Sequence, residues 1–568
     1  MRIRQLKIER FRGIRELQWD VAGCFVCLIG PGDSCKSTIL DAIELVNSPR
    51  WNPIFDDTDF YNLDTTQPIV IEATVGDLPD PLVAERKFGH HLRGWSDQGL
   101  HDEPQPGDEA VLTIRLSVDA SLQPQWLVVT DRTPDGVSIF HKDRESFGLS
   151  RLGVNAARHL GWSQGSVLAR LTDLQAIPAP LAAASRVARQ TVNLAGLTQL
   201  YAAAGKAQSL AAHLGVSPNA QFAPCLDVQS MALKQGSLSI HDGDVPLRRA
   251  GLGTQRLVAF SLQREAGNSG GPILVDEIEH GLEPHRIRRV LHALRFVPPA
   301  PAGQPQLLAP QVFLTSHSPD VIRALSSPDL HLIRNNDGVV QITQSPSELQ
   351  EILRGQSDAF LGSKVLVCEG RTELGFCRQL DRWWATSDPR RAFAYLGVVP
   401  VNGGGSNAPT VATKFREFNF PVAFLVDSDV ALQPTPAVLG ALGIEVIEWD
   451  GRVAIEGRIA LDLPWAGVLH LLQLAIDDRE GDGLGIAQSV RSKYPVALPP
   501  LDDDPLQWTE SPELRQAVGV AAKTSRWFKT IESGEQLALI VSQHLAAIPT
   551  TDLALKLQQL RSWVDRDA

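Results

Sequence analysis

The stretch that decides the fold is residues 364–373, which read Lys-Val-Leu-Val-Cys-Glu-Gly-Arg-Thr-Glu. A second stretch of the same kind, residues 422–429, reads Val-Ala-Phe-Leu-Val-Asp-Ser-Asp. Each begins with a short apolar run, which is typical of a buried parallel strand, and each ends in carboxylates. Because the carboxyl ends of parallel strands meet at one edge of a sheet, we expect Glu369, Asp427 and Asp429 to lie around one spot.

This group of carboxylates predicts a metal site. Three carboxylates share a small space only when divalent cations neutralise them, and hard oxygen ligands select Mg²⁺ or Mn²⁺. Glu373 stands four residues after Glu369, so we place both on the same face of the following helix, pointing at the same metals. The alternative, solvated carboxylates at ordinary strand ends, is less favoured because two independent strand-plus-acid patterns occur.

A phosphate-binding loop is predicted near the N-terminus. An apolar strand over residues 25–29 runs into a Gly-containing loop, and an apolar-periodic helix follows over residues 39–46. In this order of strand, loop and helix, backbone N–H groups hold the phosphates of ATP, Lys36 reaches the β and γ oxygens, and Ser37 binds Mg²⁺. Cys35 stands where the motif has glycine, and its Cβ is expected to strain the loop or crowd a phosphate. The predicted ATP contacts of this loop are Gly30, Gly32, Asp33, Ser34, Cys35, Lys36, Ser37 and Thr38.

The motifs that complete such an ATP site occur far along the chain. Residues 272–277 form an apolar strand that ends in the Walker B pair Asp276 and Glu277. Asp276 would organise Mg²⁺, and Glu277 would activate the attacking water. Residues 311–317 form another strand and end in His317, which is placed like a switch histidine that senses the γ-phosphate.

Gly251, Gly253 and Thr254 open an apolar helix directly before the Walker B strand. The segment resembles the signature of ABC-type and SMC-type ATPases, which contacts the ATP bound to the other subunit. Leu252 stands at the usual serine position, so Thr254 or backbone N–H groups would serve the γ-phosphate. The alternative for this segment alone is a Gly-containing helix cap.

The second half resembles the Toprim domain of topoisomerases, primases and a set of nucleases. The resemblance is carried by Glu369-Gly after the first strand and Asp427-Ser-Asp after the later one, and Glu373 matches the second glutamate of the nuclease branch. An ABC-type ATPase followed by a Toprim domain is the organisation of the OLD (overcoming lysogenisation defect) nucleases. The chain resembles this family, which includes the nuclease of the Gabija system, over essentially all of its 568 residues.

The resemblance implies an α/β fold, with an ABC/SMC-like P-loop ATPase head that carries a helical insertion and is followed by a Toprim α/β domain. It implies an ATP-binding and hydrolysing, metal-dependent DNA endonuclease with a two-metal site for Mg²⁺ or Mn²⁺, acting in prokaryotic antiphage defence. The partners that it implies are DNA, a second copy of the chain or a higher homo-oligomer, and an operon-encoded protein.

The same resemblance assigns the residues of the nuclease site. Glu369 and Asp427 are the central catalytic carboxylates, and Ala454 stands where the family usually has an aspartate two residues before a further glutamate. A late lysine would stabilise charge on the cleaved phosphate; Lys523 is the first choice and Lys529 the second. The metal ligands would be Glu369, Glu373, Asp427, Asp429 and Glu456, with Ser37 and Asp276 for the metal of ATP.

About 240 residues separate Lys36 from Asp276, far more than a compact P-loop domain needs, so a segment is inserted between them. The insertion is expected to hold two or three helices, which serve either as a dimer contact or as a helical cap on the monomer. The predicted domains are the first part of the ATPase (1–154), the insertion (155–222), the second part of the ATPase (223–345), a linker (346–362), and the Toprim domain with a C-terminal helical segment (363–568).

The composition fits these expectations. A chain of 568 residues with 43% hydrophobic residues can build two to four domains with sizeable cores. It contains no run of about 18 apolar residues, which a membrane span would need. The net charge of −12 argues against a uniformly basic nucleic-acid binder, so DNA would need a local basic strip. Six scattered cysteines indicate a reduced, cytoplasmic protein.

Other functions stay open at this stage. Cys35, Leu252 and Ala454 would favour an ATP-gated DNA-binding scaffold with a weakened nuclease that acts through a partner protein. An SMC-like repair ATPase is disfavoured because no heptad arms are visible. A Toprim topoisomerase would need a transesterifying tyrosine, and the chain has four tyrosines with no obvious domain that presents one.

Overall fold

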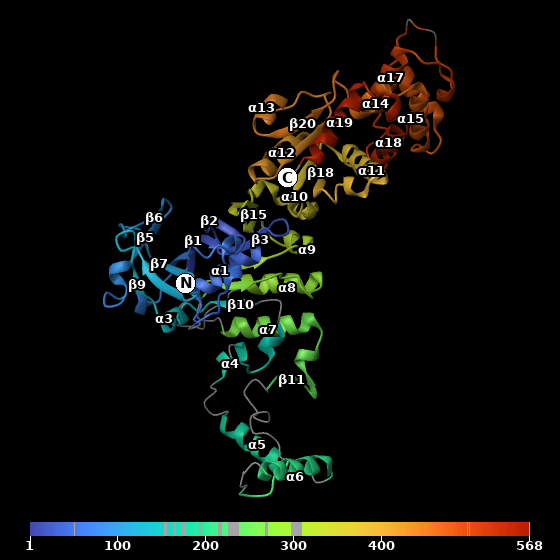
Figure 1. Cartoon of the computed structure of the whole chain (residues 1–568). Helices are drawn as coiled ribbons and strands as arrows, with labels where there is room; N and C mark the ends of the chain where they lie inside the picture. Colours follow the sequence, from blue (N-terminus) through green and yellow to red (C-terminus); the bar gives the residue numbers. More distant parts are fainter. Residues whose placement is uncertain are drawn as a thin grey trace, which may run out of the picture.

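The computed structural model describes residues 1–49, 52–152, 156–163, 166–172, 178–191, 196, 198–213, 219–224, 238–266, 271–296, 309–496, 498 and 500–566. The first half is built around a large sheet and the second around a smaller one (Figure 1). Helices of the insertion stand at the end of the molecule opposite to the second half (Figure 1).

The described strands of the first half form one 14-stranded mixed sheet, in the order β10-β13-β14-β3-β15-β16-β2-β1-β4-β7-β5-β6, with β8 paired to β7 and β9 to β8. The segment from β10 to β15 is parallel, and most of the remaining pairs are antiparallel. The strands are β1 (Arg2–Phe11), β2 (Ile14–Asp20), β3 (Phe25–Ile29), β4 (Ile69–Gly76), β5 (Arg93–Ser96), β6 (Gly99–His101), β7 (Glu109–Val118), β8 (Pro124–Val129), β9 (Val137–Ser138), β10 (Ser150–Leu152), β13 (Ile273–Val275), β14 (Val312–Thr315), β15 (Leu330–Asn336) and β16 (Val339–Gln344).

The parallel segment confirms the predicted strands of the ATPase motifs. β3, β13 and β14 are apolar and almost fully buried, as a strand covered on both faces must be. They lie side by side, so the loops at their carboxyl ends meet at one edge of the sheet. The helices of this half are α1 (Lys36–Asn47), α2 (Asp80–Val83), α3 (His141–Glu145), α7 (Leu252–Ala266), α8 (Pro284–Arg295) and α9 (Pro319–Arg323).

The second half holds a four-stranded parallel sheet in the order β18-β17-β19-β20. The predicted apolar runs at residues 364–368 and 422–426 form its two central strands, and both strands are buried along their whole length. The strands are β17 (Lys364–Cys368), β18 (Val398–Asn402), β19 (Val422–Val426) and β20 (Ile444–Glu448). The helices are α11 (Arg371–Ser387), α12 (Ala408–Glu417), α13 (Pro436–Ala441), α14 (Ile455–Asp462), α15 (Trp465–Asp477), α16 (Gly483–Arg491), α17 (Pro512–Thr524), α18 (Ile531–His544) and α19 (Asp552–Asp565).

The segment 346–362, predicted as a linker, is a packed junction. It forms η9 (Ser347–Leu349), α10 (Gln350–Gly355) and η10 (Ser357–Phe360). Leu353 and Phe360 are fully buried in a hydrophobic core that also contains Ile29 from the first half and Phe415 from the second. The two halves therefore share a core; the domain boundaries themselves stay a prediction.

The insertion contains three described helices, α4 (Val167–Leu171), α5 (Pro178–Thr191) and α6 (Thr198–His213). This agrees with the expectation of two or three helices. α4 packs against α7, whereas α5 and α6 stand away from the large sheet (Figure 1). A short hairpin of β11 (His241–Asp242) and β12 (Val245–Pro246) leads into η7 (Leu247–Arg249), directly before α7.

No single described helix is long and apolar enough to cross a membrane. One bent pair, residues 531–547 with 552–565, meets the test on length and composition only.

Candidate functional site

Lys36 opens α1 and turns back onto the phosphate-binding loop. Its ammonium donates to the carbonyls of Gly30 at 3.0 Å and Pro31 at 2.7 Å, and to the hydroxyl of Ser34 at 3.1 Å. Burial lowers the pKa of Lys36 to about 8. The side chain is thus held by neutral acceptors in a place where a phosphate would supply the missing negative charge.

Asp276 follows β13 and gathers the groups expected around the metal of ATP. Its carboxylate accepts from the hydroxyl of Ser37 at 3.1 Å and from that of Thr315 at 2.7 Å. Arg151, the central residue of β10, lies 3.3 Å from the same carboxylate and also pairs with Glu44 of α1. The loop serine and the Walker B aspartate are therefore brought together as predicted, whereas the arginine beside them was not predicted.

Glu277 and His317 stand beside this pair. The backbone of Glu277 has a φ of 45°, a left-handed conformation that few non-glycine residues adopt and that is frequent at functional sites. Its N–H donates to the hydroxyl of Thr315 at 2.8 Å, which fixes the strained turn. The N–H of His317 donates to Glu279 at 2.6 Å, and burial together with nearby Lys36 lowers the pKa of His317. The imidazole is thus suited to sense a phosphate as a neutral group.

Cys35 has the backbone strain that the sequence predicted. Its φ of 69° lies in the left-handed region that favours glycine. The thiol accepts a hydrogen bond from the side-chain amide of Asn335 at 3.3 Å and lies beside Gly13. Burial raises the pKa of this thiol, so it stays neutral at physiological pH.

The predicted signature segment lies at the exposed start of α7. Leu252 and Thr254 are exposed, and Gly253 is buried against the carbonyl of Gly281 so closely that a Cβ would lie 2.5 Å from that oxygen. Within the same subunit, buried Arg256 donates to the carbonyls of Asp276 at 2.9 Å and His280 at 3.1 Å. The start of α7 is therefore linked to the Walker B turn of its own subunit while its outer side stays accessible.

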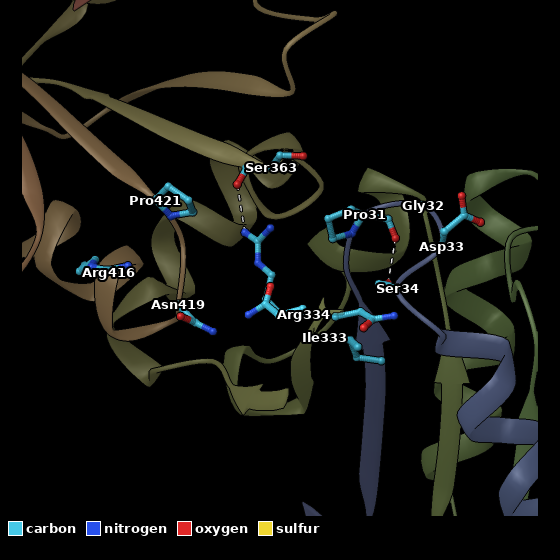
Figure 2. A pocket seen from close by; sticks show the side chains of 12 residues that line it. Pro31, Gly32, Asp33, Ser34, Ile333, Arg334, Ser363, Arg416, Asn419 and Pro421 are labelled. Carbon is cyan, nitrogen blue, oxygen red and sulfur yellow. Dashed lines mark hydrogen bonds between the residues drawn. The ribbon is translucent and has the colours of Figure 1, made fainter. Parts of the chain in front are cut away.

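A polar cavity of about 410 Å³ separates the phosphate-binding loop from the second half (Figure 2). Arg334 of β15 lies in it and donates to the carbonyl of Ser363 at 3.0 Å, with its guanidinium 4.9 Å from the ring centre of Phe420. Its Nε is buried and has no hydrogen-bond partner among the described residues. The cavity is also lined by Pro31 to Ser34 of the phosphate-binding loop and by Arg416 of the second half.

The carboxylates of the second half meet at the carboxyl edge of the small sheet. The N–H of Asp427 donates to Glu369 at 3.0 Å, and the carboxylate of Asp427 accepts from the N–H of Ile455 at 2.9 Å. The carboxylate of Glu373 accepts from the N–H of Gly370 at 2.8 Å. α11 begins at Arg371, so Glu369 precedes this helix, and the prediction that Glu369 and Glu373 share a helix face is wrong.

Mutual repulsion shows that these groups share one environment. Burial, with the nearby charges of Glu456 and Glu369, raises the pKa of Glu373 to about 7. Burial and the charges of Glu373, Glu456, Glu369 and Asp429 raise the pKa of Asp427 well above its usual range. The pKa of Glu369 is raised as well, again chiefly by burial. All five predicted ligands therefore belong to one electrostatic cluster, which we call the carboxylate cluster.

Both candidate lysines reach the carboxylate cluster, so the structure does not separate them. Lys523 of α17 forms an ion pair with Asp429. Lys529, just before α18, donates to Glu456 at 3.1 Å. Burial alone would lower the pKa of Lys529, but Glu456, Glu373 and Asp427 together raise it, so this ammonium stays charged.

Close helix contacts bring these lysines to the carboxylates. A Cβ at Gly375 of α11 would lie 2.0 Å from the carbonyl of Ile531 in α18. A Cβ at Gly519 of α17 would lie 2.8 Å from the Cα of Gly457 in α14. Glycines at these crossings allow α11, which carries Glu373, to lie directly on α18, which follows Lys529. They likewise allow α14, which carries Glu456, to lie directly on α17, which carries Lys523.

The donor set fits a divalent cation. Glu456 is completely buried, and its Oε2 has no hydrogen-bond partner among the described residues. Carboxylate oxygens are the ligands that Mg²⁺ and Mn²⁺ select. As the side chains stand, however, no group of three His, Cys, Asp or Glu residues in the described ranges is placed to hold an ion. Ala454 is buried at the start of α14 and contributes no ligand.

Sequence reasoning missed Arg151, Thr315, Arg256 and Arg334. Thr315 could have been noticed, because a hydroxyl follows the apolar run of the His317 strand. Arg151 lies on a three-residue strand without a recognisable motif, and Arg334 makes its hydrogen bond from the first half to the second. Only tertiary structure could reveal these two.

The comparisons with known proteins bear on the first half. Residues 235–323 match the family model described as "AAA domain, putative AbiEii toxin, Type IV TA system". This segment holds α7, the Walker B pair and His317, and the chain therefore carries a P-loop ATPase domain of the AAA type. No curated protein matches the sequence significantly.

Among solved structures, the chain is similar to the SMC head domain from Thermotoga maritima, with 13% identity and a TM-score of 0.30 over 61% of this chain and 100% of that one. It is also similar to an SMC head bound to the C-terminal winged-helix domain of ScpA (12% identity, TM-score 0.31, 61% and 99% covered). A third similar structure is the SMC head with an extended coiled coil bound to the C-terminal domain of ScpA from Pyrococcus furiosus (10% identity, TM-score 0.33, 62% and 98% covered).

Proposed function

We propose that this protein is an ATP-binding and hydrolysing, metal-dependent DNA endonuclease of the OLD type, acting as a dimer or larger homo-oligomer. The observation that carries the proposal is the carboxylate cluster, with two lysines beside it, at the carboxyl edge of a parallel sheet in a chain that carries an ATPase domain. The expected role in antiphage defence belongs to the same proposal and rests on the resemblance of the sequence alone.

In the nuclease reaction, Glu369, Glu373, Asp427, Asp429 and Glu456 would hold Mg²⁺ or Mn²⁺, which would neutralise charge and activate water against the phosphodiester. Asp427 is oriented for this by the N–H of Ile455. Lys523 and Lys529 place positive charge beside the cluster, where they would stabilise a cleaved phosphate.

In the ATPase reaction, Lys36 would bind the β- and γ-phosphates, and Ser37 with Asp276 would hold Mg²⁺. Glu277 would orient the attacking water. The exposed start of α7 supports completion of the site by a second subunit, because Leu252 and Thr254 face away from their own subunit. Exposed apolar side chains on α5 and α6, including Val187 and Leu210, support a dimer contact rather than a cap.

A plasmid-cleavage assay with Mg²⁺ or Mn²⁺, each with and without ATP, tests the nuclease. We expect cleavage that requires the divalent metal. Absence of cleavage under all four conditions would overturn the nuclease. Light scattering should give at least a dimer at micromolar concentration, and a strict monomer with and without ATP would overturn the shared ATP site.

The second candidate is an ATP-gated DNA-binding scaffold with a weakened nuclease that acts through a partner protein. Two observations favour it: the lysines already pair with Asp429 and Glu456, and no three ligands in the described ranges are placed around an ion. Metal-independent DNA binding together with absence of cleavage would select the scaffold.

A further inference from the structure

α8 carries an unusual concentration of positive charge. Its residues, Pro-His-Arg-Ile-Arg-Arg-Val-Leu-His-Ala-Leu-Arg, include four arginines and two histidines and no acidic residue. The protein as a whole has a net charge of −12. A solvated helix of a soluble acidic protein normally mixes both signs of charge, so an all-basic face indicates a partner of opposite charge.

The packing of α8 decides which of these side chains are available. Ile287, Val290, Leu291 and Leu294 form its buried face. The opposite face exposes His285, Arg288, Arg289 and His292, which we call the basic strip. Because these four positions follow the spacing of one helix face, their side chains project to the same side.

Two of the arginines of α8 are already neutralised. Arg286 pairs with Glu283 at 3.0 Å, and Arg295 pairs with Asp329. Among the described residues, no acidic side chain pairs with Arg288 or Arg289. Their guanidinium groups are thus exposed and uncompensated, which is the state that a polyanion would neutralise.

Further positive charge lies next to the start of the helix. A Cβ at Gly253 would lie 3.1 Å from the guanidinium of Arg286, so the turn into α7 lies beside the beginning of α8. That turn exposes Arg248 and Arg249 on η7. Gln255 fixes it by donating to the carbonyls of Arg248 and Ala250. Exposed arginines therefore lie on η7 as well as on α8.

We propose that the basic strip of α8 binds the phosphate backbone of duplex DNA. At 1.5 Å per residue the strip is about 10 Å long, which matches about three phosphates at the rise of one DNA strand. Exposed guanidinium groups bind phosphate oxygens in pairs, independently of base sequence. The strip lies on α8, between α7 and α9 on the ATPase half (Figure 1), so DNA would contact this half as well as the carboxylate cluster. This inference rests on the proposed function and adds the surface that holds the substrate.

The test measures binding of a short fluorescent DNA duplex to the full-length protein by anisotropy, over a series of salt concentrations and without divalent metal. Arg288→Ala with Arg289→Ala should weaken binding roughly tenfold and reduce the slope of log K against log salt by about 1.8, because two phosphate contacts are lost. Arg288→Lys with Arg289→Lys keeps both charges and should retain most of the affinity.

The matched control is Arg86→Ala with Lys142→Ala. These two cations are exposed in the part of the chain around α2 and α3, and the change removes the same charge. An unchanged slope in the Arg288/Arg289 variant, an equal loss in the control, or an altered oligomeric mass with unchanged DNA binding would each overturn the proposal.

If the parent protein binds DNA through the strip but never cleaves it, the nuclease fails while the strip stands. If the parent cleaves DNA and the variant binds with the parental slope, the strip alone fails.

Discussion

The ATP site and the carboxylate cluster bury charge in opposite ways. The ammonium of Lys36 has three neutral acceptors, and the carboxylate of Asp276 has two hydroxyl donors and an arginine beside it. In the second half, carboxylates repel one another, and Glu456 Oε2 has no partner among the described residues. The first site thus surrounds its buried charges with hydrogen-bonding or opposite-charge partners, whereas the second concentrates negative charge that we expect cations to stabilise.

The largest effect should come from removing the centre of the carboxylate cluster. Asp427→Ala takes away a predicted metal ligand, and we expect DNA cleavage to fall by roughly 100-fold or more, the scale of losing one electrostatic stabiliser of a transition state. ATP hydrolysis should stay within about twofold, because the two sites lie in different halves. Plasmid cleavage and phosphate release measure the two activities.

Asp502→Ala, which removes an exposed carboxylate from a loop, is the matched control and should change neither activity. If Asp427→Ala cuts DNA as fast as the parent protein, the nuclease assignment fails and the scaffold replaces it.

Two substitutions in the ATP site should separate ATP binding from ATP hydrolysis. Lys36→Ala loses a charge-assisted phosphate contact, which corresponds to roughly 10- to 100-fold in ATP affinity. Glu277→Gln should keep affinity and stop hydrolysis, because it removes only the group that orients water. Calorimetry and phosphate release distinguish the two. Tight ATP binding by the Lys36 variant would show that the loop does not hold the phosphates.

The contrast between the sites also predicts a pH dependence of stability. The pKa of Glu373 is raised from 4.5 to about 7 in the folded protein, so the native state binds more protons than the unfolded state between these values. The contribution of Glu373 to the free energy of unfolding of the metal-free protein should therefore fall as pH rises from about 4.5 to about 7, by about 3 kcal/mol at most, whereas buried His331, whose pKa is lowered to about 4, contributes in the opposite direction.

Thermal melts across this pH range, with and without Mn²⁺, measure the effect. Mn²⁺ should restore stability at the upper end, where the carboxylates are charged. Asp427→Asn keeps the acceptor for Ile455 but removes one repelling charge, and its melting temperature should depend less on pH. An Asp427→Asn protein whose melting temperature depends on pH as steeply as that of the parent would contradict the account of the cluster.

The sequence sufficed for features that are encoded locally. Buried apolar runs predicted β17 and β19 and thereby the meeting of Glu369 and Asp427 at one sheet edge. Glycine-like geometry at Cys35 followed from the motif as well. Features that depend on contacts between distant segments were out of reach: Arg151 beside Asp276, and the glycine crossings that bring both lysines to the cluster. The choice between Lys523 and Lys529 stays open, because both side chains reach the carboxylate cluster.

The smallest expected effect concerns the joint between the two sites. Gly30 packs on the carbonyl of Ile333, where a Cβ would lie 2.6 Å from the oxygen, and the next residue, Arg334, donates to Ser363. Ser363 immediately precedes β17, and Phe420, beneath the same guanidinium, lies two residues before β19. Arg334 thus connects the region of the phosphate-binding loop to the beginnings of β17 and β19. These are the two strands that Glu369 and Asp427 directly follow.

We expect Arg334→Met to leave ATP hydrolysis and metal-dependent cleavage within about twofold when each is measured alone, because it touches neither set of reacting groups. The factor by which ATP changes the cleavage rate, in either direction, should shrink by about fivefold, the lower end of typical coupling between sites. Arg416→Met is the matched control: Arg416 lines the same cavity, but among the described residues its guanidinium donates to carbonyls within the second half, those of Leu442 and Phe420. An ATP effect that survives in the Arg334 variant as in the control would mean that the two sites communicate elsewhere, for example through the shared core around α10.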